Sequence, residues 1–188
     1  MNKAPALILI MGLPATGKTT LSKKVAEAFD LPLISRDEIK VQIMDSVGWG
    51  DREWSKKVGK ASYSLQDYMI KHLAHSKASF IVESDFAPEF ANEKFNRIHE
   101  AGYDIIQIIC SASDDVIIKR FKERAAEEAT HPSSTEGQQG LDDLHAALAR
   151  GQRQPLDVPG KILHLDTTAI NETSYSDVLQ ELRGLLSA

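Results

Sequence analysis

The chain has 188 residues, of which 42% are hydrophobic and 26% charged, and its formal net charge is -5. This length suffices for one hydrophobic core, so we expect residues 1–188 to form a single domain. The acidic balance argues against a broad nucleic-acid-binding surface, which needs an excess of Lys and Arg. A single cysteine, Cys110, excludes an intrachain disulfide. The early apolar run 6–11 is too short to span a membrane. We therefore expect a cytoplasmic protein with no membrane partner.

Short apolar runs alternate along the chain with longer segments of helical periodicity, which is typical of a parallel sheet covered by helices. The expected strands are residues 6–11, 32–35, 79–83, 104–110 and 161–165. The expected helices are residues 17–29, 36–47, 56–75, 88–101, 114–128 and 172–186. These elements predict an α/β fold with three layers, α/β/α, around a five-stranded parallel sheet.

The helix expected over residues 56–75 carries apolar residues at steps of three and four, and we expect this stripe to face the core. Its members are Val58, Ala61, Leu65, Tyr68, Met69 and Leu73. Just before this helix, Trp49 and Trp54 are expected to anchor a loop into the core, with the wall of a substrate pocket as the alternative.

A segment rich in turn-forming residues, 130–140, shows no apolar period and predicts a mobile surface loop. We place a mobile lid or loop at about residues 125–155. This stretch contains His131, Arg150 and Arg153, and the sequence assigns no role to any of them.

One motif lies directly between the first strand and the first helix. Residues 12–19 fit G-x-x-x-x-G-K-[ST] at every fixed position, which predicts a phosphate-binding P-loop. Glycines let backbone amides approach phosphates, Lys18 neutralises β and γ oxygens, and Thr19 offers a hydroxyl to Mg²⁺. We expect nucleotide contacts from Gly12, Leu13, Pro14, Ala15, Thr16, Gly17, Lys18, Thr19 and Thr20.

A second polar cluster, Ser35-Arg36-Asp37-Glu38, follows the second strand. In an open parallel sheet the carboxyl ends of the strands form the ligand crevice, so Asp37 should face the phosphates. Its carboxylate could take a proton from an acceptor hydroxyl or hold the metal through water, and Arg36 could bind an anionic part of the substrate. Helix capping by Ser35 and Glu38 is the alternative interpretation.

The third strand ends in Glu83-Ser84-Asp85, which places two acids at another carboxyl strand end. Either acid is a candidate for positioning the acceptor or the waters of Mg²⁺. Acids after a strand also cap helices and turns, and that alternative stays open for both.

The P-loop followed by a strand and Arg-Asp-Glu resembles the P-loop kinases grouped with polynucleotide 5′-kinase, zeta-toxin-like kinases and chloramphenicol phosphotransferase. The resemblance covers nearly the whole chain. It implies the sheet order of nucleoside-monophosphate kinases with a short lid, and it implies that Asp37 is the base that activates the acceptor hydroxyl. It also implies that Arg120 and Arg124, four residues apart, lie at the edge of a lid over ATP, with Arg124 close to the transferring phosphoryl group.

Taken together, these features favour an ATP- and Mg²⁺-dependent kinase that moves the γ-phosphate to a hydroxyl of a small molecule. Lys18, Asp37 and Arg124 are the expected catalytic residues. Arg120 is expected on the nucleotide, and Arg36, Glu83 and Asp85 on the acceptor. A polynucleotide or nucleotide-sugar kinase and a nucleotide-dependent switch with slow ATPase activity remain alternatives. The acceptor, the choice between ATP and GTP, and the oligomeric state stay open.

Overall fold

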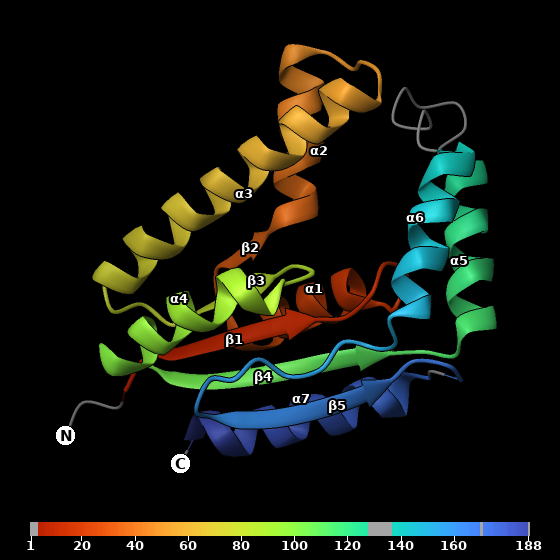
Figure 1. The fold of residues 1–188 in the computed structure, drawn as a ribbon. Helices are drawn as coiled ribbons and strands as arrows, with labels where there is room; N and C mark the ends of the chain where they lie inside the picture. Colours follow the sequence, from red (N-terminus) through yellow and green to blue (C-terminus); the bar gives the residue numbers. More distant parts are fainter. Residues whose placement is uncertain (1–3, 128–136, 170, 188) are drawn as a thin grey trace.

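Five parallel strands form the centre of the computed structural model, in the order β2-β3-β1-β4-β5 (Figure 1). They are β1 (Ala6–Met11), β2 (Leu33–Ser35), β3 (Phe80–Glu83), β4 (Asp104–Ser111) and β5 (Lys161–Asp166). The structure describes residues 4–127, 137–169 and 171–187. Strand β1 is buried at every position and pairs with β3 and β4, so the loop that follows it opens at the middle of the sheet. The predicted fold class is confirmed.

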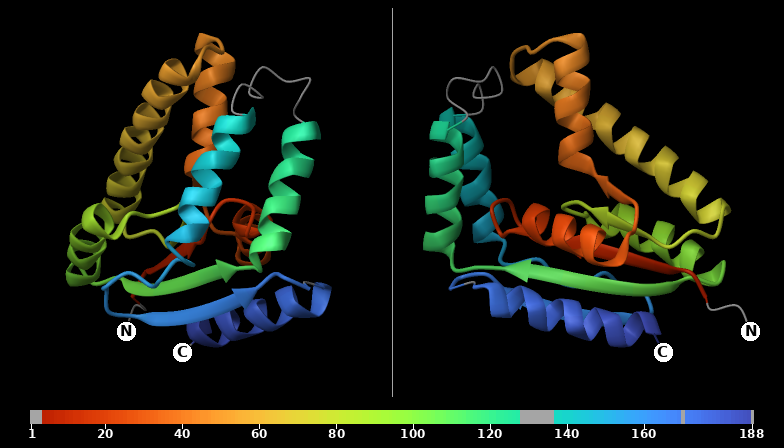
Figure 2. Two further views of the ribbon diagram at one scale, coloured as in Figure 1. Left: turned by 45° about the vertical axis from the view of Figure 1, so that its right-hand side comes forward. Right: turned by 180° about the vertical axis from the view of Figure 1, so that it is seen from behind.

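Helices cover both faces of this sheet (Figures 1 and 2). The described helices are α1 (Lys18–Phe29), α2 (Arg36–Val47), α3 (Arg52–His75), α4 (Pro88–Glu100), α5 (Asp114–Glu127), α6 (Gly137–Ala149) and α7 (Glu172–Ser187). Alternate residues of β1 point to opposite faces: Ile8 and Ile10 pack in one core cluster with residues of α1 and α7, and Leu7 and Leu9 pack in another with α4 and the end of α3. Among the described residues, no helix combines the length and apolar character needed to cross a bilayer.

Two helical pairs stand above the sheet, α2 with α3 and α5 with α6 (Figure 2). The second pair has its own small core, in which Ile117 and Leu144 are buried and Ala15 of the P-loop is packed against them. An ion pair of 2.7 Å between Arg52 of α3 and Asp143 of α6 joins the two pairs. The two pairs therefore face each other across the loop that follows β1.

The predicted apolar stripe of α3 is correct at its ends and wrong in its middle: Val58 is buried and Leu73 packs on the core, but the predicted residues between them are exposed. Leu65, Tyr68 and Met69 are 46%, 61% and 41% exposed, because the amino-terminal part of the helix packs on α2 rather than across the sheet. The Gln66 amide donates to the backbone carbonyl of Glu83 over 3.1 Å, which fixes the inward face. The buried residues of the helix are Ser55, Val58, Gly59, Ser62, Gln66 and Ile70.

The start of α3 also differs from the prediction. The Asp51 carboxylate accepts a hydrogen bond from the Trp54 backbone amide over 2.9 Å, and this cap starts the helix four residues before the predicted start. Trp54 therefore lies on the helix surface, 36% exposed, with its indole N–H donating to the Gly48 carbonyl. The expected core anchoring by Trp54 is wrong, and Trp49 is half-buried.

Helix α6 was not predicted, and its first turn falls within the segment expected to be a loop. Two glycines and two glutamines lower the local helix signal, but Leu141, Leu144 and Leu148 recur at steps of three and four and pack against α5. Tertiary packing thus overrides local propensity here. Residues 128–136, with His131, lie outside the described residues.

Candidate active site

The backbone of the P-loop has three residues with positive φ. Gly12, Ala15 and Gly17 have φ values of 153°, 62° and 85°. A Cβ on Gly12 would lie 2.2 Å from the Cys110 carbonyl oxygen and 2.6 Å from Thr16 Oγ1, so any larger residue would displace the loop. Successive amides in such a turn, followed by the first turn of α1, form a concavity suited to phosphate oxygens.

Side-chain hydrogen bonds of Thr16, Lys18 and Thr167 stabilise the conformation of the P-loop. Thr16, fully buried, donates from Oγ1 to the Leu13 carbonyl over 2.7 Å, and Lys18 Nζ donates to the same carbonyl over 2.9 Å. The Thr167 hydroxyl lies 3.1 Å from the carbonyl oxygens of both Thr16 and Ser111. Thr167 was not among the predicted site residues, although it lies directly after β5, at a carboxyl strand end where site residues are expected.

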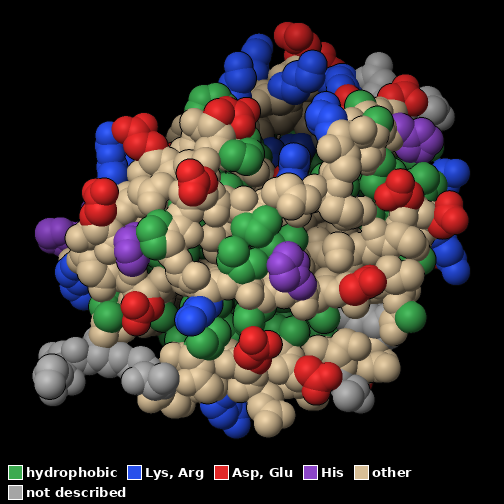
Figure 3. Space-filling model, turned by 60° about the horizontal axis from the view of Figure 1, so that its bottom comes forward, with side chains coloured by type: hydrophobic (Ala, Val, Ile, Leu, Met, Phe, Trp, Pro, Cys, Tyr) green, Lys and Arg blue, Asp and Glu red, His purple; other side chains and the backbone are tan. Residues whose placement is uncertain are grey.

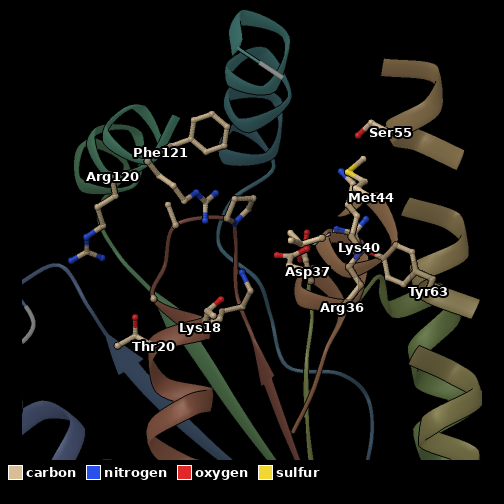
Figure 4. Close-up of a pocket in the computed structure, with 17 residues that line it drawn as sticks. Lys18, Thr20, Arg36, Asp37, Lys40, Met44, Ser55, Tyr63, Arg120 and Phe121 are labelled. Atoms are coloured by element: carbon tan, nitrogen blue, oxygen red, sulfur yellow. Dashed lines mark hydrogen bonds and ion pairs between the residues drawn. The ribbon is translucent and has the colours of Figure 1, made fainter. Parts of the chain in front are cut away.

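A pocket of about 510 Å³ lies in front of the P-loop, between the two helical pairs (Figure 4). Basic side chains outnumber acidic ones in its lining, which suits a polyphosphate ligand. In Figure 3, Lys and Arg side chains gather around a hollow at the upper edge of the view. The lining residues are Pro14, Ala15, Gly17, Lys18, Thr19, Thr20, Arg36, Asp37, Lys40, Val41, Met44, Ser55, Tyr63, Asp85, Arg120, Phe121 and Arg124.

Asp37 enters the pocket from the first turn of α2, across from Lys18 (Figure 4). The side chain of Ser35 caps this helix by accepting from the Glu38 amide over 3.4 Å, so the capping and site interpretations are compatible. The Asp37 carboxylate is 61% exposed and accepts from Arg36 Nη1 over 2.7 Å. Loss of solvent acts to raise the pKa of Asp37, but Arg36, with Lys18 and Arg124 farther away, lowers it below its ordinary value. Asp37 is therefore ionised near neutral pH.

Glu83 does not line the pocket. Its side chain is 1% exposed and accepts a hydrogen bond of 2.5 Å from Ser35 Oγ. Burial raises the pKa of the Glu83 carboxyl above its ordinary value, against the opposing effects of Ser35 and Lys18. A raised pKa in the folded state means that stability from this group is present at low pH and declines as pH rises through the folded value. Glu83 contributes to the site through Ser35 and the start of α2.

Asp85 does line the pocket, and it is paired with an arginine to which the sequence assigned no role. Arg153 donates from Nη2 to Asp85 Oδ2 over 2.7 Å and from Nε to the other carboxylate oxygen. Such a two-point pair fixes the plane of the carboxylate. Arg150, three residues earlier, is exposed just after α6. Asp85 and Arg153 lie 68 residues apart along the chain, so no local sequence motif indicated this contact.

The two arginines of α5 have different surroundings. Arg120 donates from Nη1 and Nη2 to the hydroxyl and carbonyl oxygens of Thr167, over 2.9 and 2.6 Å, and its guanidinium points away from Lys18 (Figure 4). Arg124 lines the pocket with its guanidinium carbon 5.8 Å from the centre of the Phe121 ring. Both arginines line the pocket, and Arg120 also links α5 to Thr167, the support of the P-loop.

Comparison with known proteins gives related sequences and folds. A family model described as an AAA domain matches residues 7–150. A cytidylate kinase from Methanosarcina mazei is 32% identical over 119 residues, a match that covers 62% of this chain and 62% of that protein. This chain therefore spans less than two thirds of the length of that curated relative.

Solved structures extend the comparison over the whole chain. A protein from Chloroflexus aurantiacus, named only as a candidate kinase, has 35% sequence identity and a TM-score of 0.83, with 97% of this chain and 98% of that chain covered. Shikimate kinase from Bacteroides thetaiotaomicron has 19% identity and a TM-score of 0.53, with 97% and 99% covered, and shares the fold alone. The narrower resemblance to polynucleotide 5′-kinase, zeta-toxin-like kinases and chloramphenicol phosphotransferase stays a prediction.

Proposed function

We propose that this chain, which belongs to the AAA domain family AAA_33 of P-loop kinases, is an ATP-dependent kinase that transfers the γ-phosphate to a hydroxyl of a small molecule. One observation carries the proposal: Lys18 of the P-loop, Asp37 of α2 and Arg124 of α5 line the same pocket of about 510 Å³. A P-loop alone is shared by kinases, ATPases and switches. The ionised carboxylate of Asp37, across the pocket from Lys18, adds a group that can bind an acceptor hydroxyl.

On the nucleotide side, backbone amides of residues 12–19 bind the β- and γ-phosphates, and Lys18 neutralises their oxygens. Gly12 lets the loop pack directly on the Cys110 carbonyl and the Thr16 hydroxyl, which a Cβ would prevent, and this keeps the loop in its phosphate-binding shape. Thr19 lines the pocket in the first turn of α1, where its hydroxyl is suited to hold Mg²⁺. Bound Mg²⁺ supplies neutralisation of the charge that develops on the phosphate oxygens.

On the acceptor side, Asp37 accepts the hydrogen bond of the attacking hydroxyl and receives its proton. The lowered pKa of Asp37 keeps its carboxylate ionised and able to orient the hydroxyl. A weak base suffices, because a loose phosphoryl-transfer transition state needs little prior deprotonation of the hydroxyl. Asp85, fixed by Arg153, offers acceptor oxygens to a further hydroxyl of the substrate. Arg124 adds positive charge beside the transferring phosphoryl group.

A second candidate function is transfer to a phosphate oxygen, favoured by the similarity to cytidylate kinase. The two candidates differ in their need for a base. A phosphate acceptor is already deprotonated near neutral pH, whereas a hydroxyl acceptor must lose its proton during transfer. Removing the negative charge of Asp37 should therefore impair only the hydroxyl reaction strongly.

The test is ADP release from Mg·ATP by the pure protein. Acceptors are supplied as separate pools of small hydroxylated metabolites, nucleosides, nucleoside monophosphates and 5′-hydroxyl oligonucleotides. For a hydroxyl acceptor, Asp37→Asn should lower kcat roughly 100- to 10,000-fold and leave ATP affinity within about twofold. Lys18→Ala should weaken both, and Asp45→Asn, on an exposed site of the same helix, should change neither.

The outcomes separate the candidates. Full turnover of a hydroxyl acceptor by Asp37→Asn would refute the assignment of the base. Stimulation by nucleoside monophosphates that persists in Asp37→Asn would favour the phosphate acceptor. Slow turnover that no pool stimulates would favour a nucleotide-dependent switch.

A further inference from the structure

The guanidinium of Arg36 packs against α3 at the acceptor side of the pocket. Its central carbon lies 4.7 Å from the centre of the Tyr63 ring. Gly59 makes room for it, because a Cβ at that position would lie 3.2 Å from Arg36 Nη2. The Arg36 side chain is 22% exposed. Stacking on an aromatic face and close packing remove much of the conformational freedom that an arginine would lose on binding a ligand.

The hydrogen-bonding capacity of this guanidinium is only partly used. Nη1 donates to Asp37 Oδ1 over 2.7 Å, but Arg36 Nε is buried and has no hydrogen-bond partner among the described residues. A buried donor without a partner is costly and calls for an explanation. The Nε and Nη2 edge of a guanidinium matches the two oxygens of a carboxylate or phosphate group.

We propose that the acceptor is a hydroxyl compound that carries an oxyanion, a carboxylate or a phosphate ester, and that this anion binds the Nε and Nη2 edge of Arg36 beside Asp37. The inference rests on the proposed function, since it names the acceptor class of the same pocket. The Arg36–Asp37 hydrogen bond uses Nη1 and Oδ1. It therefore leaves the second oxygen of Asp37 for the acceptor hydroxyl, and the opposite edge of the guanidinium for the anion.

The anion need not displace Asp37, because Asp37 uses only Nη1 of the guanidinium. The charged lining of the pocket favours the incoming anion: Arg36 and Lys40 both lie on α2, and Asp85 is already paired with Arg153. Hydrogen bonds between an oxyanion and a partly buried guanidinium are worth roughly 10- to 150-fold in affinity.

A binding experiment tests this inference without turnover. The protein, labelled with ¹⁵N in arginine and saturated with Mg·ADP to occupy the P-loop, is titrated with sodium acetate, inorganic phosphate or glycerol. The Nε–H resonance of Arg36, assigned through Arg36→Gln, is followed by NMR. We expect a saturable shift with acetate or phosphate and none with glycerol, and the tighter anion identifies the acceptor's charged group. Absence of a saturable shift with both anions would overturn the inference.

A turnover arm uses acceptors that stimulate ADP release. Arg36→Gln should raise KM for a charged acceptor at least about tenfold and leave ATP affinity unchanged. Arg97→Gln on α4, whose side chain is 73% exposed, is the matched control. Efficient turnover of a neutral alcohol that Arg36→Gln does not change would refute the inference and keep the kinase. Failure of every acceptor would instead count against the proposed function, while the NMR titration still decides the anion site.

Discussion

Substitution of Gly12 by alanine offers a sharp test of how the P-loop is built. The added Cβ would lie 2.2 Å from a backbone carbonyl oxygen, at a φ of 153°. Overpacking of this kind costs about 1–3 kcal/mol, and an unfavourable backbone conformation adds roughly 1–2 kcal/mol. Together they reduce the free energy of unfolding by about 2–5 kcal/mol, or roughly 4–20 °C in Tm. Because the clash would displace the backbone of the phosphate-binding loop, nucleotide affinity should fall as well.

Gly160→Ala supplies a matched control for this substitution. Its Cβ would lie 2.2 Å from the Ile105 carbonyl oxygen at a φ of 150°, but at the amino end of β5, the opposite end of the sheet from the P-loop. Both variants should lose similar stability in urea unfolding. Only Gly12→Ala should lose affinity for Mg·ATP, measured by calorimetry at a temperature where both are folded. Equal ATP affinities in the two variants would refute the assignment of the concavity to phosphate binding.

Two further predictions concern charged groups outside the phosphate concavity. The raised pKa of Glu83 causes the free energy of unfolding to decline as pH rises above the ordinary range of a glutamate, and Glu83→Gln should remove this decline. An unchanged pH profile in urea titrations would contradict the buried, protonation-dependent role of Glu83. A double-mutant cycle of Arg52→Ala and Asp143→Ala should give a coupling energy of about 0.2–1 kcal/mol that shrinks in high salt, because Asp143 is 68% exposed. A coupling above about 2 kcal/mol would show that the pair is not a surface interaction.

Most of the sheet could be predicted from local pattern. The runs around β1 and β4 are apolar on both faces, which only a central parallel strand requires, and the predicted ends of β1 agree with the structure. The inward face of α3 could not be predicted in this way. That face is small and polar because it packs on another helix and caps strand ends, so hydrophobic periodicity selected Leu65 and Met69, which are exposed.

The site residues also divide into those that local sequence pattern could predict and those that depend on tertiary packing. The P-loop and Asp37 stand at carboxyl strand ends, where sequence order alone reveals proximity to the pocket. Arg153 and Thr167 contact the site through partners 68 and 151 residues away along the chain, and neither residue belongs to a local motif. Long-range pairs of this kind depend on the arrangement of loops between elements. Their roles at the site are accordingly visible only in three dimensions.

The polar inner face of α3 also has a consequence for motion. Beyond Ile70, towards its amino end, the helix leaves the hydrophobic core, and serines, a glycine and a glutamine make most of its buried contacts. Such contacts contribute little hydrophobic free energy compared with the fully buried β1. Amide hydrogens in this part of α3 should therefore exchange with solvent through local opening, well before those of the central strands. The wall of the pocket that carries Tyr63 and Gly59, beside the acceptor, should therefore open more readily than the sheet below it.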